Sequence, residues 1–213
     1  MSLISKKLKS IEFVIFDCDN ILINSDMLTI SVMLDMIEDH GKKLNLDKAI
    51  ALFGGKSLEK CIPILEKICN VQFDESHLIK CLDAEMLCGL EPSPGVEKFI
   101  TNLKVPYCLA TKLTNDVLSQ KLSLSGLTSY FKEHQITNNI TDSYSNSVLQ
   151  IAAINGFTPY QTLIIKDRSD ELQDIKKYGF IVAGISHLPS HKNDNSILSY
   201  HDINELYEFV EIG

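Results

Sequence analysis

Hydrophobic and polar positions along the chain predict an α/β protein that carries a purely helical insert. Residues 11–16 form an apolar run interrupted only by Glu12, which is typical of a buried strand. Further along, apolar residues recur at helical spacing, and successive helical patterns follow one another with no strand pattern between them. These expected helices cover residues 27–37, 46–53, 58–69 and 75–87.

Beyond the connector at residues 91–95, which contains two prolines, strand and helix patterns alternate. Such alternation indicates a parallel sheet whose strands are joined by helical crossovers. We therefore expect a Rossmann-like parallel-sheet core made of residues 1–25 and 91–213, with an all-helical cap at residues 26–90. The expected core strands cover residues 107–110, 131–136, 162–165 and 180–185, and the expected helices 96–103, 115–124, 145–155, 171–178 and 202–210, with a loop at 187–196.

Composition and charge narrow the class of protein. The 20 Lys and Arg residues against 28 Asp and Glu give a net charge of −8, which argues against a nucleic-acid partner. No apolar run approaches the roughly 20 residues that a membrane span needs, and residues 1–10 do not resemble a secretory signal. The six cysteines form no CxxC pair, which disfavours a zinc site and suits reduced thiols. We expect a cytoplasmic monomer with no membrane partner.

Two carboxylates, Asp17 and Asp19, come directly after the first expected strand. Like charges this close raise each other's pKa unless a cation lies between them, and a divalent cation prefers oxygen ligands. The carboxyl edge of a parallel sheet is also where α/β folds place their sites. This stretch therefore predicts a metal–carboxylate centre. Cys18, between the two aspartates, is expected to point away from them and pack in the core.

Other expected strands end in residues that complement this pair. The strand at 107–110 leads into Thr111 and Lys112, and the strand at 162–165 leads into Lys166 and Asp167. Three carboxylates with a hydroxyl and lysines suit Mg²⁺ and a phosphate group. One aspartate is able to attack phosphorus, and the other to exchange a proton with the leaving oxygen and later with water.

The first of these segments also resembles a known family motif. Residues 17–25 read Asp-Cys-Asp-Asn-Ile-Leu-Ile-Asn-Ser, which is similar to the Asp-x-Asp-Gly-(Thr/Val)-Leu-x-Asp-Ser motif of the haloacid-dehalogenase superfamily. More narrowly, nearly the whole chain resembles the branch with a small helical cap. That branch includes beta-phosphoglucomutase and sugar-phosphate phosphatases such as 6-phosphogluconate phosphatase.

The resemblance implies a role for each matching residue. Asp17 is the expected nucleophile and a metal ligand, and Asp19 the acid/base that also binds the metal through its carbonyl. Thr111 takes the phosphate-binding hydroxyl position, and Asp167 that of a metal-binding aspartate. The cofactor would be Mg²⁺. Lys56, in the Gly-Lys-Ser loop of the cap, is expected to bind substrate.

The chain departs from the family pattern at two charged positions. The third motif normally supplies a lysine that holds phosphate, but its place falls near Asp142, and no Lys or Arg lies between Lys132 and Lys166. Either Lys166 or Lys112 is able to supply that charge from a neighbouring strand end. However, Lys166 replaces an acid that normally precedes Asp167, and a lysine there would weaken cation binding by Coulomb repulsion.

Three further residues affect the expected site. Glu171 matches an Asp-x-x-x-Asp spacing found in other branches of the superfamily, so it is a candidate to restore the missing acid. Arg168 is either a site residue or a solvent-facing one. Asn20 replaces the usual glycine, and asparagine tolerates left-handed backbone better than most residues.

Three functions follow from these observations. The first is a Mg²⁺-dependent phosphatase that hydrolyses a small phosphorylated metabolite, such as a sugar phosphate or 6-phosphogluconate, through an aspartyl-phosphate. The second is a phosphoglucomutase-like phosphotransferase. The third is a pseudo-enzyme that keeps the fold and binds without turnover, which the missing third-motif lysine suggests.

Overall fold

The computed structural model describes residues 11–141, 143–167, 171–185, 198–200, 203 and 205–206. The chain divides into two compact units, an α/β core formed by Met1–Ile23 with Glu91–Gly213 and a helical unit formed by Asn24–Leu90. The sequence prediction began the helical cap at residue 26, and this division begins the helical unit at Asn24. Parallel sheet, flanking helices and helical insert together confirm the expected fold class.

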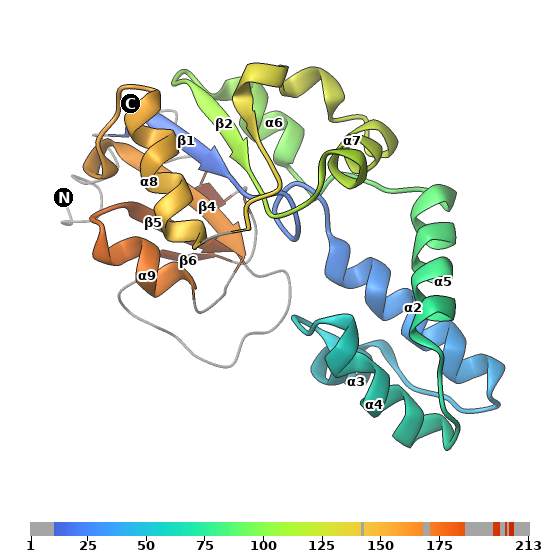
Figure 1. The fold of residues 1–213 in the computed structure, drawn as a ribbon. Helices are drawn as coiled ribbons and strands as arrows, with labels where there is room; N and C mark the ends of the chain where they lie inside the picture. Colours follow the sequence, from blue (N-terminus) through green and yellow to red (C-terminus); the bar gives the residue numbers. More distant parts are fainter. Residues whose placement is uncertain are drawn as a thin grey trace. The chain divides into compact units, whose positions relative to one another are not determined.

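The core is built on one parallel sheet with strand order β3-β2-β1-β4-β5-β6 (Figure 1). Strand β1 is central, because it pairs with β2 on one side and β4 on the other. A central parallel strand is covered on both faces, which explains why residues 13–16 are entirely apolar. The strands are β1 (Phe13–Phe16), β2 (Tyr107–Ala110), β3 (Ile136–Thr137), β4 (Thr162–Asp167), β5 (Ile181–Ile185) and β6 (Leu198–Tyr200).

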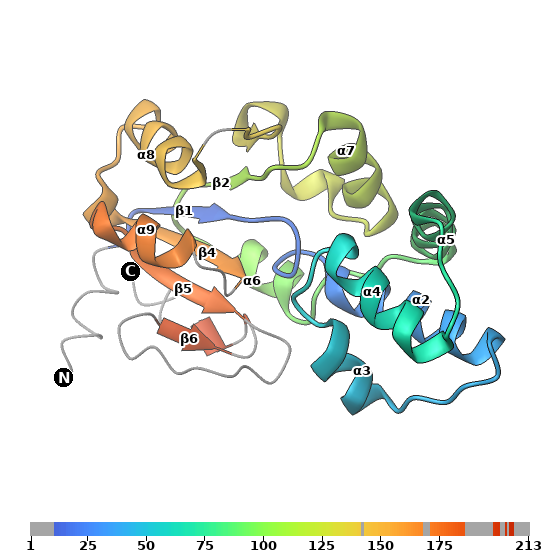
Figure 2. The same ribbon diagram turned by 60° about the horizontal axis from the view of Figure 1, so that its bottom comes forward.

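Helices cover both faces of this sheet. Phe13 and Ile15 of β1 belong to a buried cluster with Tyr144 and Val148 of α8, and α8 and α9 lie on this side of the sheet (Figure 2). On the other face, the ring of Phe16 meets Phe99 of α6 edge-on. The core helices are α6 (Val96–Asn102), α7 (Asn115–Leu124), α8 (Tyr144–Ile154) and α9 (Glu171–Lys177), with 3₁₀ turns η1 (Thr128–Tyr130), η2 (Glu133–Gln135) and η3 (Pro159–Gln161).

The helical unit consists of four helices that begin at polar caps. Asn24 and Asn45 each accept a hydrogen bond from the backbone of the first turn that follows them, at 3.3 and 3.0 Å. Helix α2 packs against the other three helices of the unit. These helices are α2 (Ser25–Asp39), α3 (Leu46–Phe53), α4 (Leu58–Cys69) and α5 (Glu75–Cys88).

The strand expected at residues 131–136 is wrong. Only Ile136–Thr137 pair with β2, and η2 precedes them. The side-chain amide of Gln135 donates to the carbonyl of Tyr107 at 3.0 Å, so a side chain takes an edge position that a strand would have filled. Strand β6 has no counterpart in the sequence prediction. The expected loop at 187–196 and most of the helix expected at 202–210 lie outside the described residues.

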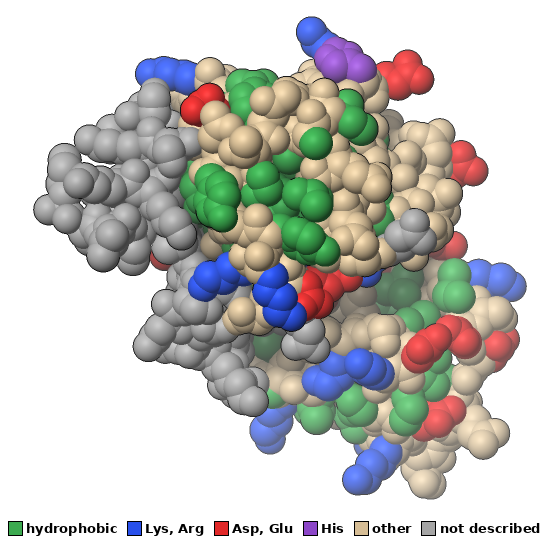
Figure 3. Space-filling model, turned by 60° about the vertical axis from the view of Figure 1, so that its left-hand side comes forward, with side chains coloured by type: hydrophobic (Ala, Val, Ile, Leu, Met, Phe, Trp, Pro, Cys, Tyr) green, Lys and Arg blue, Asp and Glu red, His purple; other side chains and the backbone are tan. Residues whose placement is uncertain are grey.

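Charged side chains of both signs are interspersed on the face drawn in Figure 3, where Lys and Arg form no continuous basic area. Among the described residues, no helix combines the length and apolar character needed to cross a membrane.

Candidate active site at the carboxyl edge of the sheet

Strand register brings Asp17 next to Lys166. Phe16 is aligned with Ile165 of β4, and the N–H of Asp17 donates to the Ile165 carbonyl at 2.9 Å. Aligned residues of parallel strands point to the same face, so the next pair, Asp17 and Lys166, share a face of the sheet. Lys166 Nζ donates a hydrogen bond to Asp17 Oδ2, and the N–H of Cys18 donates to Asp17 Oδ1 at 2.8 Å.

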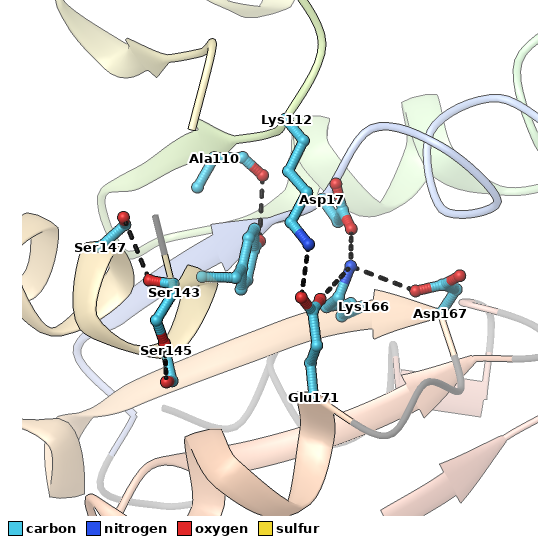
Figure 4. Close-up of polar contacts among 10 residues, drawn as sticks. Asp17, Ala110, Lys112, Ser143, Ser145, Ser147, Lys166, Asp167 and Glu171 are labelled. Atoms are coloured by element: carbon cyan, nitrogen blue, oxygen red, sulfur yellow. Dashed lines mark hydrogen bonds and ion pairs between the residues drawn. The ribbon is translucent and has the colours of Figure 1, made fainter. Parts of the chain in front are cut away.

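Lys166 contacts two further carboxylates (Figure 4). Its Nζ lies 3.2 Å from Asp167 Oδ1 and 3.5 Å from Glu171 Oε2. Asp167 Oδ1 is buried and has no hydrogen-bond partner, so its contact with Lys166 is an ion pair without hydrogen-bond geometry. Lys112 Nζ donates to Glu171 Oε1 at 2.5 Å. Three carboxylates and two ammonium groups thus meet in one cluster.

The ring of Tyr144 forms another wall of the cluster. Lys166 Nζ lies 4.6 Å from the ring centroid, within the range of a cation–π contact. The fully buried Tyr144 hydroxyl donates to the carbonyl of Ala110 at 3.0 Å, which fixes the ring against β2. Tyr144 was not among the site residues expected from the sequence. Its only signal was its position in the segment where the family places its third motif.

Burial and the neighbouring charges shift the pKa values of this cluster in opposite directions. Burial raises the pKa of Asp17 to about 6, although Lys166 acts to lower it. Burial also acts to lower the pKa of Lys166, but the charges of Asp17 and Asp167 outweigh it and hold that pKa above its usual value. For Glu171, the bonds and charges of the two lysines outweigh burial and lower the pKa. At neutral pH Asp17, Lys166 and Glu171 are therefore predominantly ionised.

The raised pKa of Asp17 predicts how stability depends on pH. Between pH 3.8 and about 6 the folded state keeps a proton that the unfolded chain releases, so raising the pH favours unfolding. Across that window the free energy of unfolding of the wild type should fall by about 3 kcal/mol relative to Asp17→Asn, and the difference should stay constant above it. Urea unfolding of both proteins at several pH values measures this, and a pH-independent difference would contradict it.

Asp19 lies in the tight turn that follows β1. Asn20 has a φ of 59°, so the asparagine occupies the left-handed conformation that the sequence comparison anticipated for it. Its N–H donates to the carbonyl of Ile23 at 2.8 Å, which closes the turn. Lys121 Nζ, from α7, donates to Asp19 Oδ1 at 2.5 Å. Lys121 was missed in the sequence, because it lies far from any motif and reaches Asp19 only through the fold.

Thr111 and Cys18 are both buried near the same edge. The Thr111 hydroxyl oxygen accepts a bond from the N–H of Leu113 at 3.3 Å, and its backbone N–H donates to Thr137 of β3. These bonds hold Thr111 at the end of β2. Burial raises the pKa of the Cys18 thiol, so Cys18 stays protonated and packs in the core as expected.

Lys56 belongs to the helical unit. It follows Gly55, whose N–H donates to Asp26 Oδ2 at 2.9 Å and whose φ of 66° is left-handed. These features fix the turn between α3 and α4 that carries Lys56. The third-motif position Asp142 and the loop residue Arg168 lie outside the described residues.

Comparison with known proteins places this geometry in context. A family model of haloacid dehalogenase-like hydrolases matches residues 14–185. Similar solved structures include a candidate beta-phosphoglucomutase from Thermotoga maritima, with 18% identity over 93% of this chain and 97% of that chain and a TM-score of 0.71. A hydrolase of the same superfamily from Deinococcus radiodurans, with bound phosphate and sodium, is 18% identical over 90% and 91% (TM-score 0.71). A predicted phosphoglycolate phosphatase from Haemophilus somnus is 13% identical over 93% and 97% (TM-score 0.68). At these identities the structural likeness establishes the fold.

The donor atoms of the cluster suit Mg²⁺, but their arrangement does not. Hydrolases of this kind generally use Mg²⁺, which takes oxygen ligands in a near-octahedral array at about 2.0–2.1 Å. An ion shared by Asp17 and Asp167 would need the space between their carboxylates, where Lys166 Nζ lies. No group of three His, Cys, Asp or Glu side chains in the described part of the chain is arranged to hold a metal. The Mg²⁺ site expected from the resemblance therefore does not fit these side chains as they stand.

Proposed function

Because the chain belongs to the haloacid dehalogenase-like hydrolase family, we propose that it is a phosphatase that forms a phosphoaspartyl intermediate on Asp17. The substrate would be a small phosphorylated metabolite, with sugar phosphates and sugar-acid phosphates such as 6-phosphogluconate as the first candidates. The observation that carries the proposal is the pairing of a buried carboxylate, Asp17, with a buried ammonium, Lys166, at the end of β1.

In the first step an oxygen of Asp17 attacks the phosphorus of the ester. A bond forms between Asp17 and phosphorus while the bond from phosphorus to the leaving oxygen breaks. Asp19 donates a proton to that leaving oxygen, so the alcohol departs neutral. Lys166 orients the Asp17 carboxylate and offsets its charge as the negative phosphoryl group approaches.

In the second step water attacks the phosphorus of the intermediate. Asp19, now ionised, takes a proton from that water, and the bond between phosphorus and Asp17 breaks. Inorganic phosphate leaves and the Asp17 carboxylate is regenerated. Lys121, bonded to Asp19 Oδ1, holds this carboxylate at the end of β1 through both steps.

Substrate contacts are assigned to residues around this pair. We infer that the Thr111 hydroxyl and Lys112 bind phosphate oxygens, because both directly follow β2 at the edge where Asp17 lies. Lys112 is half exposed and shares Glu171 with Lys166, so it is able to exchange that partner for an incoming phosphate. Lys56, in the helical unit, is the proposed contact to the rest of the substrate. The phosphate bound in a similar structure supports this class of ligand.

Binding without turnover is a second candidate, and one observation favours it. Lys166 already neutralises the proposed nucleophile, and a neutralised carboxylate is a weaker nucleophile than a free one. In that function the cluster would hold a phosphate ester or a protein partner through the same lysines. The proposal and this alternative predict the same ligand class but different products.

A substrate panel tests the proposal. The purified chain is incubated with p-nitrophenyl phosphate, 6-phosphogluconate, phosphoglycolate and glucose 1-phosphate, in EDTA and in Mg²⁺, and inorganic phosphate is measured. Release from at least one sugar or sugar-acid phosphate is the expected result. Glucose 6-phosphate formed from glucose 1-phosphate would indicate a mutase. Thermal stabilisation by an ester that is never hydrolysed would favour binding without turnover.

A further inference from the structure

One ammonium group lies at the centre of the three carboxylates of the candidate site (Figure 4). We propose that the Lys166 ammonium replaces the divalent cation at this site, so that phosphate and phosphate esters bind there without a metal. This inference rests on the proposed function, because it concerns how the same site binds phosphate. The experiments below distinguish a failure of the inference from a failure of the proposed function.

The geometry matches what an ammonium group requires. The Lys166 ammonium donates a hydrogen bond to Asp17 and lies within ion-pair distance of one oxygen each of Asp167 and Glu171. The bond to Asp17 crosses from β4 to β1, and the contact with Glu171 comes from the first residue of α9. Lys166 thus joins three elements of the core, as a bound cation with carboxylate ligands would.

Burial makes this ammonium a permanent part of the site. Lys166 is 7% exposed, and the Tyr144 ring lies against its Nζ at 4.6 Å. An ammonium taken out of water is stable only when it is well paired, and here three carboxylates lie within ion-pair distance of it. A metal could enter only if this ammonium gave up its contacts with the three carboxylates.

The position of the Lys166 ammonium, and not the net charge of the cluster, excludes Mg²⁺. Three carboxylates face two ammonium groups, so charge alone would admit a further cation. However, Asp17 Oδ2 is bonded to Lys166 Nζ, and Asp17 Oδ1 accepts the N–H of Cys18 at 2.8 Å. The oxygen of Asp167 that faces the cluster is 3.2 Å from the same ammonium. The Lys166 ammonium therefore already links Asp17 and Asp167, the two carboxylates that would hold a metal.

The sequence has lost a lysine in one motif and gained one, Lys166, in another. The segment where the resemblance placed a phosphate-holding lysine contributes Tyr144 instead, and this ring contacts the lysine that β4 now supplies. One lysine is therefore still present beside Asp17, but it comes from the strand that also carries Asp167. A position that the resemblance gave to an acid provides the positive charge.

Thermal unfolding with two probes, Mg²⁺ and inorganic phosphate, tests the inference on the wild-type chain. Mg²⁺ at about 10 mM is expected to leave the Tm unchanged, and inorganic phosphate is expected to raise it equally in EDTA and in Mg²⁺. A Tm raised by Mg²⁺ alone would overturn the inference. So would phosphate that stabilises the protein only when Mg²⁺ is present, or that fails to stabilise it in EDTA.

A variant should convert the site to metal binding. Lys166→Met removes the ammonium but keeps the length of the side chain, so Mg²⁺ should now raise the Tm by roughly 5 °C or more if present at about 100 times its Kd. Lys177→Met, which removes the partner of Asp174 on the same helix as Glu171, is the matched control and should gain no response. A folded Lys166→Met without a Mg²⁺ response would count against the inference. If Lys166→Met does not fold, the wild-type result decides.

Turnover separates this inference from the proposed function. Hydrolysis that requires Asp17 and also requires Mg²⁺ would remove the inference and leave the proposed function intact. Phosphate binding in EDTA without hydrolysis of any ester would support the inference and contradict the proposed function.

Discussion

Replacing Asp17 with asparagine should lower the rate of phosphate release by at least roughly 10⁴-fold. The amide oxygen of asparagine is a poor nucleophile, so no covalent intermediate forms on it. The fold should survive, because the two side chains have the same shape and Lys166 keeps Asp167 and Glu171 as partners. Steady-state release of phosphate from the best substrate of the panel measures the effect, and circular dichroism checks the fold.

Asp174→Asn is the matched control for this experiment. Asp174 is an exposed carboxylate of α9 that pairs with Lys177 through a bond of 2.6 Å. The substitution makes the same chemical change, at a carboxylate that also pairs with a lysine. Asp174, however, lies outside the cluster around Asp17. The control should keep wild-type turnover. If Asp17→Asn retained activity within about tenfold of the wild type, Asp17 would not be the nucleophile.

Replacing Lys166 with methionine should have the largest effect on stability. Removing one member of a buried ion pair typically costs about 3–5 kcal/mol, because the remaining charge is left without its partner. Asp17 would lose the ammonium that acts to lower its pKa, so it would bind a proton at higher pH and lose nucleophilicity. Both the free energy of unfolding and the turnover rate should therefore fall near neutral pH, and urea unfolding with the phosphate assay measures them.

Two further variants make this result specific. Lys166→Arg keeps the positive charge and should recover part of the stability, whereas Lys177→Met removes an exposed lysine and should change it little. The deficit of Lys166→Met should also shrink at low pH, where Asp17 is protonated in the wild type as well. A loss near neutral pH no larger than that of Lys177→Met would show that the Asp17–Lys166 pair contributes little.

Local patterns were enough to predict most elements of the fold. The bounds of α3, α4, α7 and β2 match the expected ones, because apolar spacing and nearby glycines or polar caps define each of them. The region 131–136 was mispredicted because its structure depends on a distant partner. Gln135 bonds to the backbone of Tyr107, 28 residues away in the chain, and no local pattern contains that contact.

The sequence was enough to predict which strand ends carry the candidate site. It was not enough to predict the register of the strands, which decides how those residues face one another. The carboxyl edge of a parallel sheet brings the residues after β1, β2 and β4 together, which explains why Asp17, Thr111 and Lys166 were singled out. Whether Lys166 faces Asp17 depends on the alignment of β1 with β4, where Phe16 pairs with Ile165. A shift of one residue would have turned Lys166 to the opposite face.

Two side chains at the site were beyond the reach of sequence reasoning. Tyr144 reaches the cluster because α8 packs on the same face as Phe13 and Ile15, and Lys121 reaches Asp19 because α7 follows β2. Each contact joins segments separated by more than twenty residues, and no local sequence pattern contains it. The three-dimensional structure supplies these partners and, with them, the position of Lys166.

Trapping the covalent intermediate tests the central claim most directly. The wild-type chain is mixed with the best substrate of the panel and quenched with borohydride, which reduces an aspartyl-phosphate to homoserine. The peptide that contains Asp17 is then sequenced by tandem mass spectrometry. We predict homoserine at position 17 only when substrate is present. Phosphate release with an unmodified Asp17, or with the modification at another carboxylate, would contradict the assignment of Asp17 as the nucleophile.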